Sequence, residues 1–193
     1  MWSATMNASY TERAPTFYEL YANGPHAATG QYLVGNQDAE KEKAVSTDLG
    51  LVFEHGAYRA RTSVFYTHFN HYLAELNTGN FRNDDGDFVG SNDADALPEA
   101  VYTGVKAQFY GAEFEGKARL WKSDIDAQQV NVDVRADYTR AENRTTGQAL
   151  PRISPFRVTT GIDYHLNNWV TRAEVTHAWA QTQVPDNDLP AKG

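Results

Sequence analysis

Apolar and polar residues alternate along several stretches of the chain. Between residues 156 and 166, apolar or neutral side chains occupy every second position, and mostly polar or charged side chains lie between them. After Asn167 and Asn168 the alternation resumes and continues from Trp169 to Val175. A period of two places successive side chains on opposite faces of a β-strand. Two such runs joined by a short turn predict a β-hairpin.

The same pattern recurs five more times, at residues 2–10, 45–53, 58–66, 110–120 and 130–138. We therefore predict an all-β fold of about seven strands, each with one apolar face and one polar or charged face. Aromatic residues lie near the strand ends, namely Tyr10, Phe53, Tyr58, Tyr66, Tyr138, Phe156, Trp169 and Trp179. Aromatic side chains in such positions are typical of the boundary between lipid tails and headgroups.

The predicted connections alternate in length. Short ones lie at residues 55–56, 122–124 and 167–168, whereas long polar ones cover residues 11–42, 74–104, 141–154 and those after 181. Long structureless loops are uncommon in compact soluble domains, but outer-membrane barrels have short turns at one end and long loops at the other. The pattern predicts antiparallel up-and-down strands that form part of a transmembrane β-barrel. The alternative is a soluble β-sandwich binding module, with apolar faces turned toward a second sheet.

Composition narrows the classes of protein further. Mean hydropathy is −0.61, and no stretch approaches the roughly 18 apolar residues of a membrane-spanning helix. The net charge of −8 argues against nucleic acid as a partner, because phosphate contacts require clustered Lys and Arg. The chain has no cysteine, which excludes disulfides and thiolate metal sites. The first residues do not resemble an export signal. If this protein is exported, we expect the chain to be a fragment of a longer one.

Three motifs carry a family resemblance. The first long loop contains Arg13-Ala14-Pro15, Glu19-Leu20-Tyr21, and Gly35-Asn36 followed by Glu42; "GAEFEG" and "LPRISPFR" follow at residues 111–116 and 150–157. In this order, over most of the chain, they resemble a TonB-dependent outer-membrane receptor. "NGPHAATGQY" in the first loop looks most like the zinc-uptake receptors, although the chain has Ala39 and Ala44 where relatives usually have leucine and often serine.

The resemblance implies a 22-stranded barrel with an N-terminal plug in the outer membrane of a Gram-negative bacterium. Such a receptor imports a scarce ligand with energy from TonB, and outer-membrane lipid surrounds it. The chain contains no candidate plug and no TonB-contacting segment. We therefore expect residues 1–193 to be a partial TonB-dependent receptor β-barrel domain, whose contacts with TonB lie elsewhere in the receptor.

The second long loop is strongly acidic. It contains Glu75, Asp84, Asp85, Asp87, Asp93, Asp95 and Glu99, against Arg82 as its basic residue. A cluster of this sign concentrates cations nearby by long-range attraction. The alternative is a mobile loop whose charges only keep it solvated.

Histidines give a more specific signal, because neutral imidazole binds zinc and carboxylates can complete the site. His26 follows a proline in the first loop, and His68 and His71 lie where the third strand enters the acidic loop. Three residues apart on a strand, these two point to opposite faces, so they can share an ion only if the strand has ended. We predict His26, His71 and His68 as metal ligands, with Asp85 and Asp87 as partners. The alternative is that they are ordinary surface residues.

Haem is a second candidate cargo, and no resident cofactor is required. Haem receptors of this family carry an axial histidine between two sequence boxes, and His26 lies between Arg13-Ala14-Pro15 and residues 36–39, where the second box is degenerate. Haem also prefers an apolar pocket, to which Tyr18, Tyr21 and Tyr32 can contribute.

We do not expect an enzyme. The sequence has no Gly-x-Ser-x-Gly motif and no Ser, His and Asp trio at a suggestive spacing. Glu113 and Glu115 share a strand face with Lys117 and Arg119, so we predict ion pairs there rather than an acid and base couple.

Overall fold

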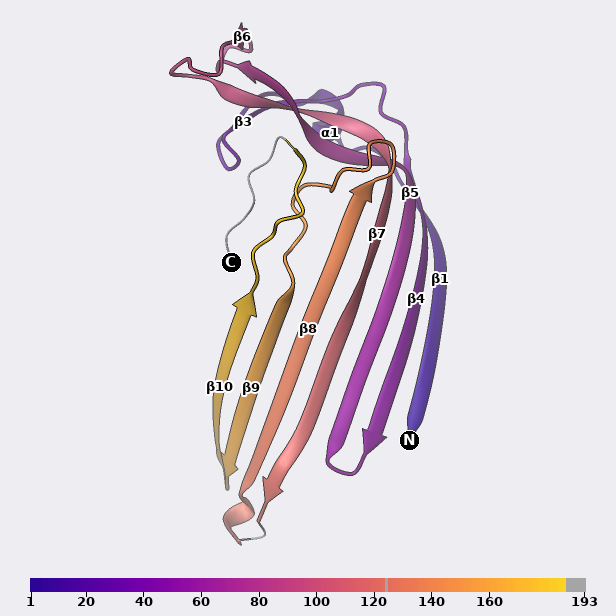
Figure 1. Ribbon diagram of the computed structural model, residues 1–193, viewed down its shortest axis with the longest axis vertical. Helices are drawn as coiled ribbons and strands as arrows, with labels where there is room; N and C mark the ends of the chain where they lie inside the picture. Colours follow the sequence, from indigo (N-terminus) through magenta and orange to yellow (C-terminus); the bar gives the residue numbers. More distant parts are fainter. Residues whose placement is uncertain (124, 187–193) are drawn as a thin grey trace.

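Seven long strands form one antiparallel sheet in the computed structural model, which describes residues 1–123 and 125–186 (Figure 1). Each long strand pairs with the next one along the chain, in the order β1-β4-β5-β7-β8-β9-β10. The predicted all-β, up-and-down fold is therefore confirmed. The strands are β1 (Trp2–Arg13), β4 (Glu42–His55), β5 (Tyr58–Arg82), β7 (Leu97–Lys122), β8 (Gln129–Asn143), β9 (Arg157–Leu166) and β10 (Trp169–Ala178).

The two ends of the sheet differ, as the connection lengths predicted. One end, the turn end, holds the β4–β5 and β9–β10 turns, where Gly56 and Asn167 adopt φ values of 56° and 49°. The β7–β8 connection at this end contains a 3-10 turn, η1 (Ile125–Ala127), and is longer than predicted. Asp124, within the predicted turn, lies outside the described residues. The longer connections gather at the opposite end, the loop end (Figure 1).

Strand register places the apolar residues on one face of the sheet, the apolar face. Leu51 pairs with Thr62, which pairs with Phe114, and directly opposed residues of neighbouring strands share a face. Leu49 and Leu51 are each 48% exposed and Ile162 is 47% exposed, so no second sheet formed by residues 1–123 and 125–186 covers them. The β-sandwich alternative is therefore wrong, because a sandwich buries these positions.

The opposite face of the sheet, the polar face, carries charges of both signs. Glu115 and Lys117 form an ion pair of 3.1 Å, and Arg157 contacts Asp137 at 3.0 Å. Packing is tightest at the loop end instead. There, a cluster of buried apolar residues is formed by Ala74, Val105, Ala107, Ala141 and Leu150, with the rings of Phe69, Tyr72 and Phe109 against it.

Residues 74–104 are not the loop that the acidic composition suggested. β5 and β7 continue past the rest of the sheet and project beyond it as a twisted hairpin (Figure 1). Leu76 pairs with Val101 and Asn77 with Ala100 in this projection, and β6 (Phe88–Val89) folds back on β5 near the tip. The acidic residues are concentrated at the tip, and their charge obscured the strand pattern on both sides of it.

The first long connection is also structured. It contains α1 (Phe17–Tyr21), β2 (Asn23–His26) and β3 (Gln31–Val34). β3 pairs in parallel with the projecting part of β7, and Leu33, opposite Ala100, is almost fully buried. Among the described residues, no helix has the length and apolar character needed to cross a membrane.

The sheet is an open arc. Within the described residues, β1 pairs with β4 alone and β10 pairs with β9 alone, so both strands are edges. The fold is thus an unclosed, curved wall of seven long strands.

Candidate functional site

The motif residues of the first loop build a charged anchor at the loop end. Arg13, at the end of β1, donates two hydrogen bonds of 2.8 and 2.9 Å to Glu19 of α1 and one of 2.5 Å to Glu42. Glu42 also accepts from the backbone N–H of Leu73 at 2.7 Å. The Arg13 guanidinium lowers the pKa of Glu19. These residues hold α1, β1, β4 and β5 together, so their role is structural.

The Gly35-Asn36 motif closes the same segment. The backbone N–H groups of Gly35 and Asn36 donate to the carbonyls of Ala22 and Glu19 at 2.6 and 2.8 Å. A Cβ at Gly35 would lie 2.6 Å from the carbonyl of Leu20. Only glycine allows the chain to pass this close to α1.

A buried ion pair fixes β3 and the projecting hairpin. The Arg82 guanidinium donates to the Glu99 carboxylate and lies between the rings of Tyr32 and Phe88, at 5.5 and 3.9 Å from their centres. Burial acts to raise the pKa of Glu99, but hydrogen bonds from Arg82, Thr78 and Asn80 outweigh it, so the pKa is lowered. Sequence reasoning noted Arg82 only as the basic exception in an acidic loop.

A second ion pair ties the "LPRISPFR" segment to the hairpin. Arg152, with a φ of 63°, donates from both terminal nitrogens to Glu75, one bond measuring 2.8 Å, and contacts Gln31 at 3.3 Å. Tyr102 donates to Glu75 at 3.3 Å, and burial together with this carboxylate raises the tyrosine pKa to about 12. Segments 121 residues apart in sequence thus meet over the loop end.

The predicted metal-binding histidines lie in three different settings. His26 is the last residue of β2, with Nδ1 3.0 Å from the Thr29 hydroxyl and its ring 6.3 Å from that of Tyr18. His68 lies on the apolar face, opposite Gln108 of β7. His71 occupies a bulge in β5 with a φ of 58°, and its Nδ1 is 3.6 Å from Glu40. β5 does not end between His68 and His71, which was the condition for a shared ion.

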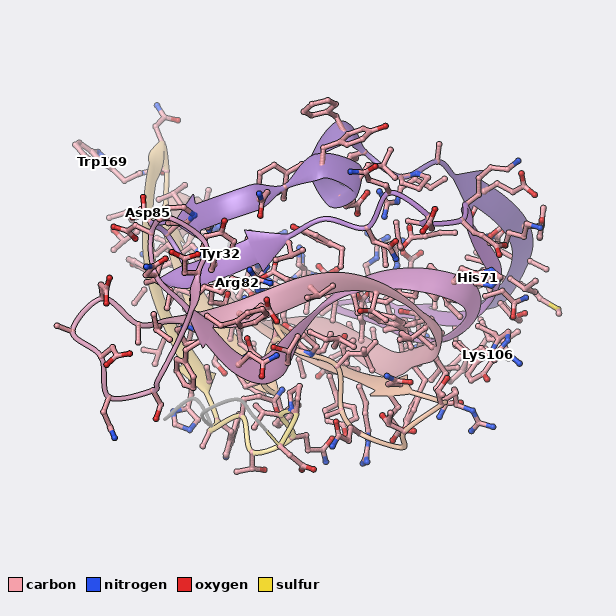
Figure 2. The ribbon with its side chains drawn as sticks, turned by 90° about the horizontal axis from the view of Figure 1, so that it is seen from above. Tyr32, His71, Arg82, Asp85, Lys106 and Trp169 are labelled. Atoms are coloured by element: carbon pink, nitrogen blue, oxygen red, sulfur yellow. The ribbon has the colours of Figure 1, made fainter. Side chains whose placement is uncertain are left out.

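Asp85 and Asp87 are exposed in the turn between β5 and β6. Figure 2 shows His71 and Asp85 on opposite sides of the molecule. In the described parts of the chain, no group of three or more His, Asp or Glu side chains is arranged to hold a metal ion. The fold therefore does not gather the five predicted residues into one site.

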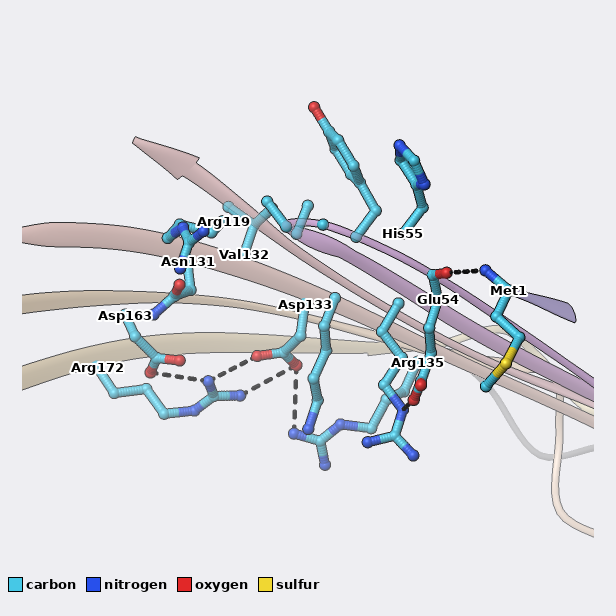
Figure 3. A pocket seen from close by; sticks show the side chains of 16 residues that line it. Met1, Glu54, His55, Arg119, Asn131, Val132, Asp133, Arg135, Asp163 and Arg172 are labelled. Carbon is cyan, nitrogen blue, oxygen red and sulfur yellow. Dashed lines mark hydrogen bonds and ion pairs between the residues drawn. The ribbon is translucent and has the colours of Figure 1, made fainter. Parts of the chain in front are cut away.

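The polar face has its own charged cluster at the turn end, in a hollow of about 690 Å³ (Figure 3). Arg172 of β10 donates to Asp163 at 2.9 Å and reaches across β9 to Asp133 at 2.7 Å. Asp133 also accepts from Arg135 at 3.3 Å. Gly161 allows this crossing, since a Cβ there would collide with the Arg172 guanidinium.

Sequence reasoning placed these charges on a wet face but missed the cluster. The only signal available was a glycine in the middle of a strand, which often marks the close approach of another group.

Comparison with solved structures gives the fold an independent reference. The "Copper transporter OprC" matches with a TM-score of 0.71 and 18% identity over 96% of this chain and 26% of that one. The siderophore receptor PirA from Acinetobacter baumannii matches with 0.58 and 16% identity, over 93% and 27%. The ferric enterobactin receptor PfeA matches with 0.55 and 18% identity, over 91% and 25%. The chain spans about a quarter of the length of these structures.

The sequence itself matches a family model. The model described as "TonB dependent receptor-like, beta-barrel" covers residues 1–192. This match agrees with the up-and-down sheet, the exposed apolar face and the long connections at one end. The chain belongs to the TonB-dependent receptor-like β-barrel family.

Proposed function

We propose that this chain is part of the barrel wall and outer loops of a Gram-negative outer-membrane receptor that captures a metal ion for uptake energised by TonB. The exposed apolar face supports a position in lipid, and the charged face suits a wet channel. The loop end is then the extracellular end, because long loops of such barrels face outward. A receptor of this kind is a transporter and not an enzyme.

The observation that carries the choice of cargo is the charge of the loop end. Residues 11–42, 70–106 and 141–156 contain thirteen Asp or Glu against six Lys or Arg. Four of the six bases, Arg13, Lys41, Arg82 and Arg152, are already paired with carboxylates. The remaining negative charge favours a cation over an anionic chelate.

His26 is the proposed first ligand for that cation. A metal-binding histidine commonly uses one ring nitrogen for the metal and the other for a hydrogen bond that orients the ring. The contact between Nδ1 of His26 and Thr29 fits this arrangement and leaves Nε2 for the metal. Zinc is our preferred ion, with His71, His68, Asp85 and Asp87 as proposed partners that require movement of the outer segments or groups from the rest of the receptor.

Haem or another iron complex is the second candidate. Tyr18 lies edge-on to His26 and also to Tyr102, with ring centres 6.2 Å apart in the latter pair. The exposed ring of Tyr18 beside the imidazole suits a flat aromatic ligand. Copper, the ion named for one structural neighbour, is a further metal to compare.

The test is titration of the full-length receptor with zinc, copper and haem by calorimetry. His26→Ala should weaken binding of the true cargo at least about tenfold, the effect of losing roughly 1.4 kcal/mol. His165→Ala, on the turn-end half of β9, is the control and should bind as the wild type does. Unchanged binding of all three ligands in His26→Ala would rule out the role of His26.

A further inference from the structure

We propose that the apolar-face side of the loop end carries a binding site for the phosphate headgroup of an anionic lipid. The site consists of Lys43, Lys106 and Arg144, which we call the basic rim. The inference rests on the proposed position of the chain in a membrane, but not on the identity of the cargo.

Strand register places the basic rim directly beyond the lipid-facing band. On the apolar face, Tyr110 of β7 is followed by Gln108, opposite Glu142 of β8. The ladder ends at Ala107 and Asn143, and Lys106 and Arg144, the first residue after β8, come next outward. The Arg144 backbone N–H donates to the Lys106 carbonyl at 2.7 Å, which holds the two residues side by side. Lys43, opposite Asn70, lies on the same face two strands away.

The distance from the aromatic residues suits a headgroup. Tyr66 and Tyr110 are directly opposed on the apolar face, where tyrosines mark the lipid interface. Lys106 lies four positions beyond Tyr110, about 13 Å along the strand and less along the membrane normal because barrel strands are tilted. Phosphate groups of lipids occupy this level, and the exposed apolar residues below offer a surface for the acyl chains.

Two of the three charges of the basic rim, those of Lys106 and Arg144, have no ion-pair partner among the described residues, whereas Lys43 lies close enough to Glu12 to help lower the pKa of that carboxylate. Nearby Glu142 is occupied by Arg140, Gln108 and Tyr110, at 2.7, 2.6 and 3.2 Å. In the described residues, neither Lys106 nor Arg144 has a carboxylate within ion-pair distance, and both side chains are exposed.

Glu12 is likewise occupied, by Lys41 and Tyr10, each at 2.7 Å. Lys106 and Arg144, two neighbouring cations without an ion-pair partner in the part of the chain that the structure describes, form a local positive site in a chain with a net charge of −8.

The basic rim and the channel for the proposed cargo lie on different sides of the sheet. Figure 2 shows Lys106 on the side of the molecule opposite Asp85 at the acidic tip. The basic rim belongs to the apolar face, so a ligand bound there sits outside the channel. Basic residues beside a membrane attract anionic lipids, at roughly fivefold in affinity for each Lys or Arg.

Native mass spectrometry of the full-length receptor in detergent tests the proposal, with phosphatidylglycerol, phosphatidylcholine and inorganic phosphate as probes. Wild type should bind phosphatidylglycerol in preference to phosphatidylcholine. Lys106→Ala combined with Arg144→Ala should lose roughly 25-fold in phosphatidylglycerol affinity. Lys106→Arg with Arg144→Lys keeps both charges and should retain binding. Arg61→Ala with Arg119→Ala removes the same charge from the polar face and should also leave lipid binding unchanged.

Three results would overturn the proposal: equal binding of both lipids by wild type, unchanged phosphatidylglycerol binding in the double alanine variant, or competition by millimolar inorganic phosphate. The last result would indicate a site for free anions. Zinc, copper and haem titrations of the same variants keep the two proposals apart. If the double alanine variant loses its lipid preference but binds cargo as well as the wild type does, the basic rim is supported. If the wild-type receptor binds none of the three cargoes, the proposed function is contradicted, but the lipid result still stands.

Discussion

At the scale of single residues, glycine marks the points where two parts of this chain come closest. Gly35 passes against the backbone of α1, and Gly161 lies under the Arg172 side chain. Gly111 lies under the ring of Phe65, with the carbonyl of Tyr138 beside it. In each case a methyl group would collide with its neighbour, so the side chain is absent for a steric reason.

We predict that Gly35→Ala destabilises the receptor by about 1–3 kcal/mol, because the added Cβ overlaps backbone atoms that cannot move independently. Thermal unfolding of the full-length receptor measures the change. Gly24→Ala is the matched control in the same segment, since nothing lies within 4 Å of a Cβ at that position. Equal melting temperatures for the two variants would show that α1 shifts without cost.

At the scale of elements, period two was sufficient to find all seven long strands, and the short turns predicted at residues 55–56 and 167–168 identified two of the hairpins. Besides the Arg172 cluster on the polar face, sequence reasoning missed the structure at the loop end. The hairpin projection depends on Leu33 packing against Ala100 and on Arg82 reaching Glu99, contacts between segments more than fifteen residues apart. Such contacts produce no periodic pattern in the sequence, because the type of each residue depends on its partner in a distant segment and not on its sequence neighbours.

The candidate site was less predictable than the fold for the same reason. The sequence identified His26, His71 and the acidic tip by residue type alone. Their distances depend on the bulge at His71 and on the direction of the projection, which no local pattern specifies. Motif residues such as Arg13 and Glu42 proved to be anchors, and their polar character did not reveal that role in advance.

The Glu99 pair makes the outer strands sensitive to acid. The pKa of Glu99 is lowered in the folded state, so its contribution is present above the ordinary carboxyl value of 4.5 and is lost as pH falls below it. We predict that amides of β3 lose protection from hydrogen exchange between pH 6 and 3, after correction for intrinsic rates. Glu99→Gln should show weaker protection already at pH 6, by about 1–3 kcal/mol, with little further change on acidification. An identical pH dependence in both proteins would contradict this assignment.

At the scale of the whole molecule, the two faces of the arc have opposite preferences. Charged pairs cover one face, whereas Leu49, Leu51 and Ile162 remain about half exposed on the other. This separation holds across all seven strands. It requires the correct register throughout, because a shift of one residue in a strand would move its apolar residues to the charged face. A position in lipid explains an exposed apolar surface that would be unfavourable in water.

Adjacent substitutions on β4 test this orientation. Leu51→Arg places a charge on the apolar face and should destabilise the full-length receptor in lipid vesicles by about 2–4 kcal/mol. Val52→Arg, one residue further, points to the polar face beside Ser3 and should cost far less. Guanidinium unfolding of both variants measures the difference. The lipid position fails if the two variants lose equal stability, or if Val52→Arg loses more.

The edge strands β1 and β10 also allow the sheet to be completed by strands from another polypeptide. Each edge presents a row of backbone donors and acceptors, and such rows template pairing with any compatible strand. A polypeptide that supplies the neighbouring barrel strands should pair with β1 and β10 during co-refolding, as the two fragments of a split reporter protein do. Because the same edge strands can pair with each other, we predict that the isolated chain self-associates when no complementary fragment is present.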